Sequence, residues 1–180
     1  KYKIPEKNII VRRLFFNIND FTNKKYFNIL FVGQFSLRKG LDDLINAIKL
    51  LEKEPVRLWI TGIPSWGQND SLDPQKMACD LKIEDKIVFW GSVPEANLKE
   101  LFGLCDLFCL PSKHFGSPEG LPISIVEAMS FSKPVLSTRH TGIPEILNEY
   151  LVNENSPEEI AKNIKIIMKK ENLDGLGQKN

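Results

Sequence analysis

Short apolar runs alternate along the chain with longer stretches of helical spacing, and this alternation constrains the fold more than any other feature. The runs have the length of single strands, and continuous apolarity is typical of strands that are buried on both faces of a parallel sheet. They lie at residues 29–32, 58–61, 87–89, 107–110 and 135–137.

The stretches between the runs carry apolar residues at spacings of three and four, which predicts amphipathic helices. The longest stripe comprises Leu41, Leu44, Ile45, Ile48 and Leu51. Shorter stripes lie at 77–81, 98–102 and 125–129, and a long one at 160–168. Regular alternation of strands and helices predicts an α/β fold with a doubly wound parallel sheet.

The last predicted helix begins with a recognisable start signal. Ser156 is placed to cap its N-terminus, Pro157 occupies the first helical position, and Glu159 completes a capping box. We expect one domain at 1–170 and a mobile tail at 171–180, where few residues are apolar. Residues 8–16 suggest an additional strand and residues 17–25 a connecting loop.

Composition excludes some classes of function. The 180 residues carry 24 basic and 23 acidic side chains, a net charge of +1, which argues against general affinity for nucleic acid or anionic membranes. No apolar run approaches the roughly 18 residues of a membrane span, and no signal peptide opens the chain. Because the sequence begins without Met, we expect it to be a piece of a longer protein.

The three cysteines, Cys79, Cys105 and Cys109, are an odd number, and the latter two flank an apolar run. This pattern favours buried free thiols and a reducing compartment. A metal site would need more ligands nearby than the segment supplies.

Ligand chemistry in a doubly wound sheet is expected outside the carboxyl ends of its strands. Glycine-containing loops follow all five predicted strands, and glycine lets a backbone approach a ligand closely. These loops lie at 33–40, 62–64, 90–92, 111–120 and 138–142. The alternation therefore predicts that the five loops converge on one functional edge.

The first of these loops ends in Arg38-Lys39-Gly40 directly before a predicted helix. A helix N-terminus has free N–H groups and about half a positive charge, so it suits a phosphate group. Lys39 adds a point charge and Arg38 a planar fork. The alternative is a solvated charged turn.

A second constellation is a pair of carboxylates, Glu119 and Glu127, that are separated by seven residues around a predicted helix start. Carboxylates accept hydrogen bonds from sugar hydroxyls, and the free amides of the helix start can hold an anion. Pro122 lacks an N–H, so Leu121 and Ile123 are the better donors. The alternative is two unrelated surface acids.

Five motifs in order make the chain resemble the group 1 glycosyltransferases, the retaining GT-B family that includes sucrose and glycogen synthases and many cell-envelope polysaccharide enzymes. The motifs are Phe31-Val32-Gly33, Arg38-Lys39-Gly40, Glu119-x7-Glu127-Ala128-Met129, Lys133-Pro134-Val135 and Gly142-Ile143-Pro144-Glu145. The resemblance covers nearly the whole chain.

The resemblance implies the Rossmann-like C-terminal domain of a GT-B enzyme, which binds a nucleoside-diphosphate sugar, while an N-terminal domain absent from this chain supplies the glycan or lipid acceptor site. It implies that Lys39 holds the diphosphate, that Glu127 binds the ribose hydroxyls, and that Glu119 is catalytic beside the donor sugar. Other implied donor-binding residues are Gly33, Arg38, Gly91, Gly120, Leu121 and Ile123. No metal or other cofactor is implied.

The same resemblance implies a cytoplasmic enzyme, with any contact to the inner face of the membrane made through the absent domain. The isolated domain is then expected to be inactive in transfer. Two departures from the family pattern stand out: Gln34 occupies a position that often holds Arg, and no glycine-containing insertion separates Glu145 from Tyr150.

Other functions stay open beside this one. A degenerate, non-catalytic homologue fits Gln34, and a regulatory or nucleotide-binding α/β module would share the fold. A receiver-like module would need an acidic cluster that Asp42, Asp43 and Asp106 do not obviously form. A dinucleotide oxidoreductase would need a Gly-x-Gly-x-x-Gly fingerprint, which is missing. His114, His140, Trp59 and Trp90 are interpreted as loop or packing residues.

Overall fold

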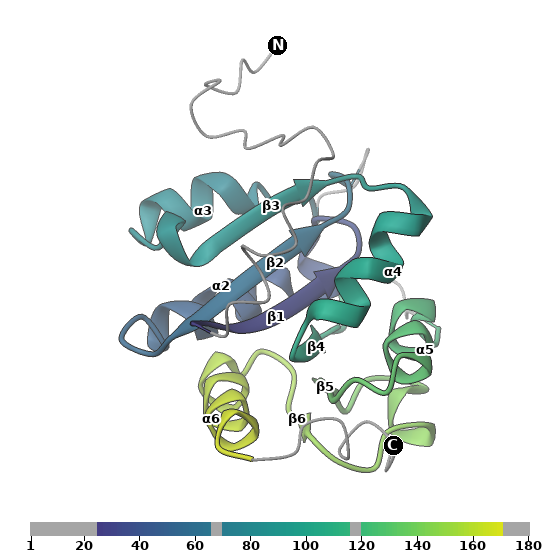
Figure 1. The fold of residues 1–180 in the computed structure, drawn as a ribbon. Helices are drawn as coiled ribbons and strands as arrows, with labels where there is room; N and C mark the ends of the chain where they lie inside the picture. The colour runs from purple at the N-terminus through teal and green to yellow at the C-terminus, as the bar shows by residue number, and fades with distance from the viewer. Residues whose placement is uncertain (1–24, 66–69, 116–119, 171–180) are drawn as a thin grey trace.

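A single parallel sheet organises the part of the chain that the computed structural model describes, residues 25–65, 70–115 and 120–170. Its strand order is β3-β2-β1-β4-β5-β6 (Figure 1). The strands are β1 (Phe27–Val32), β2 (Val56–Thr61), β3 (Ile87–Gly91), β4 (Leu107–Leu110), β5 (Val135–Thr138) and β6 (Leu151–Val152). The prediction of a parallel α/β sheet is confirmed.

Helices cover both faces of the sheet. They are α2 (Leu41–Leu50), α3 (Pro74–Asp80), α4 (Glu95–Leu104), α5 (Ile123–Ser130) and α6 (Pro157–Met168). Helix α2 contacts α3 and α6, whereas α4 contacts β1, and α5 packs on β4 and β5 (Figure 1). Short 3₁₀ turns are η1 (Leu37–Lys39), η2 (Glu84–Lys86) and η3 (Ile143–Glu145). This is the doubly wound arrangement that the sequence predicts.

The core lies between the sheet and the two helical layers. Strands β4 and β5 are buried along their whole length, as expected for strands covered on both faces. The largest fully buried side chains include Trp59, Phe31, Phe102 and Phe108. Trp59 meets Trp90 edge-to-face, with 6.2 Å between the ring centroids. Both tryptophans therefore act in packing, as the sequence suggests.

The start of α6 differs from its prediction in one respect. Ser156 is the N-cap residue, but its hydroxyl makes no capping bond and donates instead to the Glu154 carbonyl at 3.2 Å. The Glu159 carboxylate accepts a hydrogen bond from the Asn153 backbone N–H at 2.9 Å. The predicted capping box is therefore wrong, because Glu159 reaches past Ser156 to the residues that follow β6.

The connection from η3 to β6 is short, as the sequence indicates. Residues 146–150 lead directly into β6, and Leu147 is buried within them. Tyr150 adopts the left-handed backbone region, with φ of 55°, and its carbonyl accepts from the Ser137 N–H at 3.1 Å. The predictions made for 8–16, for 171–180 and for nearly all of 17–25 lie outside the described residues.

Two of the three cysteines match expectation. Cys105 and Cys109 are buried free thiols, and burial raises the pKa of Cys105 to about 12. Cys79 is instead exposed on α3, so its burial was wrongly predicted. None of the helices in the described ranges is long and apolar enough to cross a membrane.

Two glycines set the distance between neighbouring loops at the carboxyl edge. Gly40 has φ of 66°, and a Cβ there would lie 1.8 Å from the Pro111 carbonyl oxygen. Gly62 has φ of 144°, and a Cβ there would lie 1.8 Å from the Gly33 carbonyl oxygen. Both contacts are backbone against backbone, so neither neighbour can rotate away.

Replacement of Gly40 by alanine should lower the free energy of unfolding by about 2–4 kcal/mol, because it combines an unfavourable φ with a clash against Pro111. Gly103→Ala is the matched control: it lies in α4, and nothing is within 4 Å of its added Cβ. That change should stabilise by about 0.5–1 kcal/mol. Urea unfolding of both variants checks the pair, and equal stability of the two would contradict the close contact at Gly40.

Candidate functional site

The sheet has a topological switch point between β1 and β4. From β1 the chain passes to β2 on one side of the sheet order, whereas from β4 it passes to β5 on the other. The loops after β1 and β4 therefore diverge, which leaves a crevice where ligands bind in open α/β sheets. A hollow of about 540 Å³ lies there, lined by Val32, Gly33, Gln34, Arg38, Lys39, Gly120, Leu121, Pro122, Ile123 and Ser124.

The loop after β1 forms one wall of the hollow and is held by backbone hydrogen bonds to its neighbours. The Gly33 N–H donates to the Thr61 carbonyl at 3.1 Å, and the Phe35 N–H donates to the Ile63 carbonyl at 2.9 Å. The Leu37 N–H donates to the Asp70 carbonyl at 2.8 Å. All three hydrogen bonds join backbone groups, so they hold the loop in place without involving the side chains that line the hollow.

Two cations of this wall, Arg38 and Lys39, lie on the last turn of η1. The Arg38 guanidinium is 3.9 Å from the buried Asp70 carboxylate on one side and 3.5 Å from the Gln34 side-chain oxygen on the other. Gln34 thus orients Arg38. Arg38 is therefore the positive side chain next to position 34 in this loop.

The opposite wall is the start of α5. Pro122 is its N-cap residue, and Ile123 begins the helix with a side chain that is 77% exposed. The first N–H groups of a helix have no acceptor within the helix, so they face the hollow with partial positive charge. Among the described residues that line the hollow none is acidic. Two cations, a helix N-terminus and two glycines therefore surround a space suited to an anion.

The structure brings together most of the residues singled out from the sequence. Gly33, Arg38, Lys39, Gly120, Leu121 and Ile123 all line this hollow. Glu127 lies one turn further along α5, half-buried, and does not line it. Glu119 lies outside the described residues.

Gly91 also lies apart from the hollow, at the end of β3. Its carbonyl accepts hydrogen bonds from the Gly62 N–H at 2.9 Å and from the Thr61 hydroxyl at 2.7 Å. Gly91 therefore ties the ends of β2 and β3 together at the same edge of the sheet.

Lys113, which the sequence analysis did not single out, holds the start of the β4–α5 loop. Its ammonium is 2.7 Å from Asp42 and 2.9 Å from Asp43, and its backbone N–H donates to the Arg38 carbonyl at 2.9 Å. The sequence carries no local signal for this role, because Lys113 is a single lysine in the loop that follows β4. Asp106 lies at the opposite end of β4, where it accepts from the Asn28 N–H at 2.7 Å, so the three aspartates form no common cluster.

A second clamp holds the same loop from the side of β6. Glu154 accepts from the His114 backbone N–H at 2.8 Å and contacts the His140 Nδ1 at 2.6 Å. His114 is exposed and His140 is buried, so both have the structural roles expected of them. Burial opposes ionisation of Glu154, but its hydrogen bonds to His114 and His140 prevail and lower its pKa.

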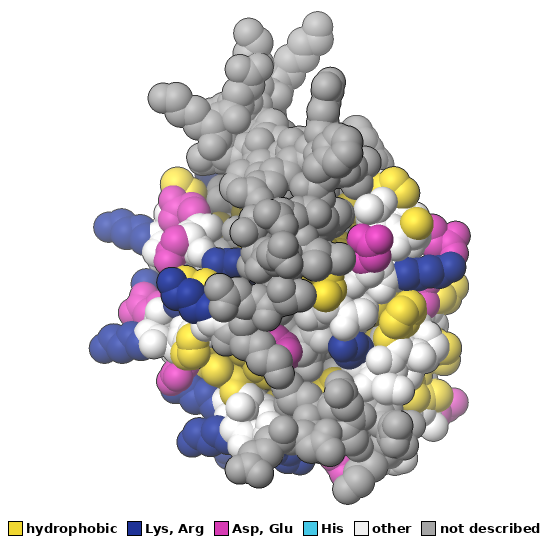
Figure 2. Space-filling model, viewed as in Figure 1, with side chains coloured by type: hydrophobic (Ala, Val, Ile, Leu, Met, Phe, Trp, Pro, Cys, Tyr) yellow, Lys and Arg dark blue, Asp and Glu magenta, His cyan; other side chains and the backbone are white. Residues whose placement is uncertain are grey.

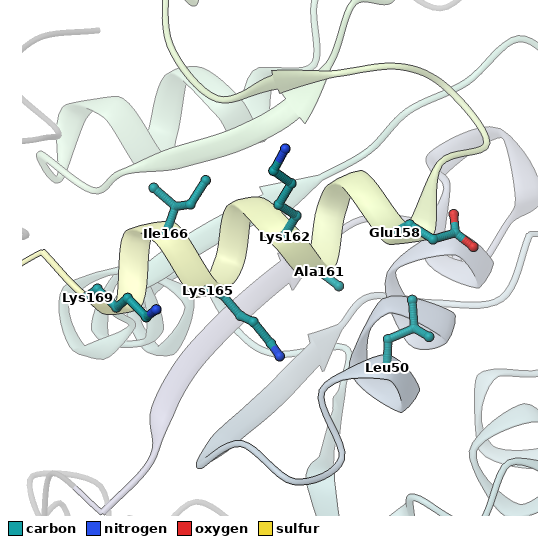
Figure 3. Close-up of a pocket in the computed structure, with 7 residues that line it drawn as sticks. All are labelled: Leu50, Glu158, Ala161, Lys162, Lys165, Ile166 and Lys169. Atoms are coloured by element: carbon teal, nitrogen blue, oxygen red, sulfur yellow. The ribbon is translucent and has the colours of Figure 1, made fainter.

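A further hollow, of about 390 Å³, lies along α6 and is lined by Leu50, Glu158, Ala161, Lys162, Lys165, Ile166 and Lys169 (Figure 3). Its lining comes from α2, from α6 and from Lys169 at the end of α6, and Lys165 is paired with Glu54 at 3.0 Å. It lacks the strand-end loops of the first hollow. Elsewhere, the face in Figure 2 shows acidic side chains between the basic ones along its margins. In the described ranges no group of three or more His, Cys, Asp or Glu side chains is arranged to hold a metal ion.

Comparison with known proteins gives a consistent result. The family model described as "Glycosyl transferases group 1" matches residues 14–176. The chain is 30% identical over 171 residues to the putative colanic acid biosynthesis glycosyltransferase WcaL of Salmonella typhimurium, covering 87% of this chain and 41% of WcaL. The chain thus spans about two-fifths of the length of that relative.

Solved structures share the fold at low sequence identity. HepE of Anabaena, solved with UDP and glucose, superposes with a TM-score of 0.78 at 22% identity, covering 98% of this chain and 47% of HepE. The C-terminal domain of LpcC, a glycosyl transferase group 1 protein of Francisella tularensis, superposes with a TM-score of 0.72 at 20% identity, covering 89% of this chain and 86% of that one. These likenesses confirm the predicted fold class, the Rossmann-like domain of GT-B glycosyltransferases.

Glu154→Gln should lower the free energy of unfolding at pH 7 by about 1–2 kcal/mol, because an amide accepts the two hydrogen bonds less well than a carboxylate. Since folding lowers the pKa of Glu154 from its ordinary value of 4.5, its contribution is full above that value. The contribution disappears as the pH falls through the lowered pKa. Urea unfolding from pH 7 to pH 3 checks this, with Glu100→Gln on the exposed face of α4 as control. If the free energies of unfolding of Glu154→Gln and the unchanged chain still differ at pH 3, the role of the carboxylate charge is contradicted.

Proposed function

The chain belongs to the group 1 glycosyltransferase family, and from this premise we propose that the hollow between β1 and α5 binds the diphosphate of a nucleoside-diphosphate sugar. The observation that carries the proposal is the position of Arg38 and Lys39 opposite the start of α5, across one space without a described acidic side chain. HepE, which shares the fold, was solved with UDP and glucose. UDP is accordingly the first nucleotide to test.

The physical basis of binding is electrostatic. Lys39 supplies a full positive charge, and Arg38, oriented by Gln34, supplies directed N–H donors. The N–H of Ile123 supplies the partial charge of a helix start, and the N–H of Leu121, just before the N-cap residue Pro122, is a further backbone donor. Gly33 and Gly120 leave no side chain between the anion and the backbone of either wall. The same groups would stabilise the diphosphate as it leaves, when its negative charge increases.

The remaining parts of the donor are assigned by family resemblance. Glu127 lies beyond the hollow on α5, where a ribose attached to the diphosphate would extend, and its carboxylate would accept from the ribose hydroxyls. The backbone at Gly91 would face the base. Glu119 would contact the donor sugar beside the reacting carbon, with retention of configuration and without a metal ion.

We infer that the whole protein is a cytoplasmic glycosyltransferase of cell-envelope polysaccharide biosynthesis. The relative WcaL, named for colanic acid biosynthesis, supports this inference. Its acceptor, a glycan or lipid, would bind mainly to a part of the enzyme that this chain does not include. A non-catalytic nucleotide-binding module is the second candidate, favoured by Gln34 in place of the usual arginine. Saturation-transfer NMR with UDP, GDP, ADP and their glucose conjugates identifies the base and tests binding directly.

Substitution of Lys39 and Glu127 should impair binding in different ways. Lys39→Ala should weaken binding of the nucleoside diphosphate by roughly 1.5–3 kcal/mol, as for a lost hydrogen bond to a charged group, and leave the nucleoside unaffected. Glu127→Ala should weaken both ligands and reduce discrimination between ribose and 2′-deoxyribose, because a site built for a hydroxyl rejects a ligand without it. Calorimetric titration measures both effects. The ligands are the nucleoside and the nucleoside diphosphate, each in its ribose and 2′-deoxyribose form, and the proteins are the two variants and the unchanged chain.

Two results would contradict these assignments. Unchanged diphosphate affinity in Lys39→Ala would place the phosphate site elsewhere, for instance at Arg38 or at Arg139, which directly follows β5. Intact ribose discrimination in Glu127→Ala would make Glu127 a surface residue of α5 and remove the family assignment at its central motif.

The isolated chain should bind nucleotide and transfer no sugar. Transfer requires donor and acceptor to be held in attack geometry, and without the acceptor-binding part that positioning is lost. A transfer assay with radiolabelled donor compares this chain with a full-length enzyme. Turnover by the isolated chain at the full-length rate would show that the described domain contains the whole site.

A further inference from the structure

Lys113 is a buried lysine with two acidic partners, which is an uncommon arrangement. Only 6% of the residue is exposed, and its ammonium is within 2.9 Å of both Asp42 and Asp43. Lysine is almost never buried to this extent unless it is paired. Burial alone would lower the pKa of Lys113, but its hydrogen bonds to the two aspartates raise it overall, so the ammonium stays charged.

The acidic pair carries more negative charge than Lys113 can balance. Burial raises the pKa of Asp43 despite the hydrogen bond from Lys113, and the neighbouring charge of Asp42 adds to that effect. The second oxygen of Asp42 is buried and has no hydrogen-bond partner in the described part of the chain. Two carboxylates therefore share one ammonium.

Lys113, Asp42 and Asp43 form a charged trio that adjoins the cationic wall of the hollow without lining it. Asp42 and Asp43 are in the first turn of α2, which begins after Gly40, while Lys39 immediately precedes that glycine. The Lys113 N–H is bonded to the Arg38 carbonyl at 2.9 Å. Without Lys113, two carboxylates would lie within a few residues of the groups that face the anion.

We propose that Lys113 is a positioning residue for the anion site: its ammonium neutralises the Asp42–Asp43 pair and so preserves the positive potential of Arg38 and Lys39 in the hollow. It also joins the loop that leads to Gly120 to the helix that follows Lys39. The inference rests on the proposed function, because it concerns the same hollow. It assigns diphosphate affinity to a side chain that does not line that hollow.

If the charges act in this way, removing the ammonium of Lys113 and removing the carboxylates of Asp42 and Asp43 should change the affinity for UDP in opposite directions. Lys113→Met should weaken binding of UDP by about tenfold, because it exposes the ligand to like charge, and should leave uridine binding unchanged. D42N/D43N, with Lys113 retained, should tighten UDP binding by about threefold. The triple variant K113M/D42N/D43N should return to within about threefold of the unchanged chain. All these differences should shrink in high salt.

Calorimetric titration with UDP, GDP, uridine and guanosine at low and high ionic strength is the test. Lys162→Met, which removes the same charge from an exposed position on α6 that does not line the hollow, is the matched control and should change nothing (Figure 3). Thermal unfolding reports whether each variant is folded. If Lys113→Met does not fold, D42N/D43N decides the question, since it contains no unpaired carboxylate at these positions.

If the unchanged chain binds UDP, two outcomes overturn the inference and leave the proposed function intact. One is a fall in uridine and UDP affinity by the same factor in Lys113→Met, which would mean a general structural role. The other is unchanged or weaker UDP binding by D42N/D43N. An unchanged chain that binds none of the four probes would overturn the proposed function, and the inference with it.

Discussion

The close approach of the β1–α2 loop to the β4–α5 loop is the constraint on which the site depends. Gly40 lies against the carbonyl of Pro111 at a distance that excludes any side chain, and the Lys113 N–H bonds to Arg38 immediately beside it. The two loops start from adjacent strands and diverge on opposite sides of the sheet order. Their divergence leaves the hollow open, and their contact at the base fixes its width.

Much of this architecture was predictable because burial dictates residue type. The strands are apolar since both of their faces are covered, and α2 carries its stripe since one of its faces is covered. Capping was less predictable. Whether Glu159 bonds to Ser156 or to Asn153 depends on how β6 approaches α6, and local spacing carries no information about that approach. Cys79 was misjudged similarly, because α3 is short and presents that position to solvent.

The residues of the candidate site also differ in how far the sequence predicts them. Glycines and cations in a strand-end loop indicate phosphate chemistry by their type alone, so Gly33, Arg38 and Lys39 could be selected from the sequence. Lys113 could not, because a lysine is ordinarily a surface residue, and only the fold places it beside two aspartates 70 and 71 residues away in the chain. A side chain that lines a site can be recognised from its residue type and its position after a strand. A side chain that acts on the site through other residues can be recognised only from the tertiary structure.

The pairing of β1 with β4 also has a consequence for how the domain is made. The Asn28 N–H bonds to Asp106, 78 residues later, and the β1–β4 ladder forms beside that bond. Contacts so distant in sequence form slowly, because a long loop must close before they contribute. During synthesis, β1 and β2 can pair early, but the free edge of β1 stays exposed until β4 has left the ribosome. At about 5–20 residues per second this interval lasts several seconds. In that time the apolar edge of β1 is open to wrong partners, and the hollow between β1 and α5 still lacks one of its two walls.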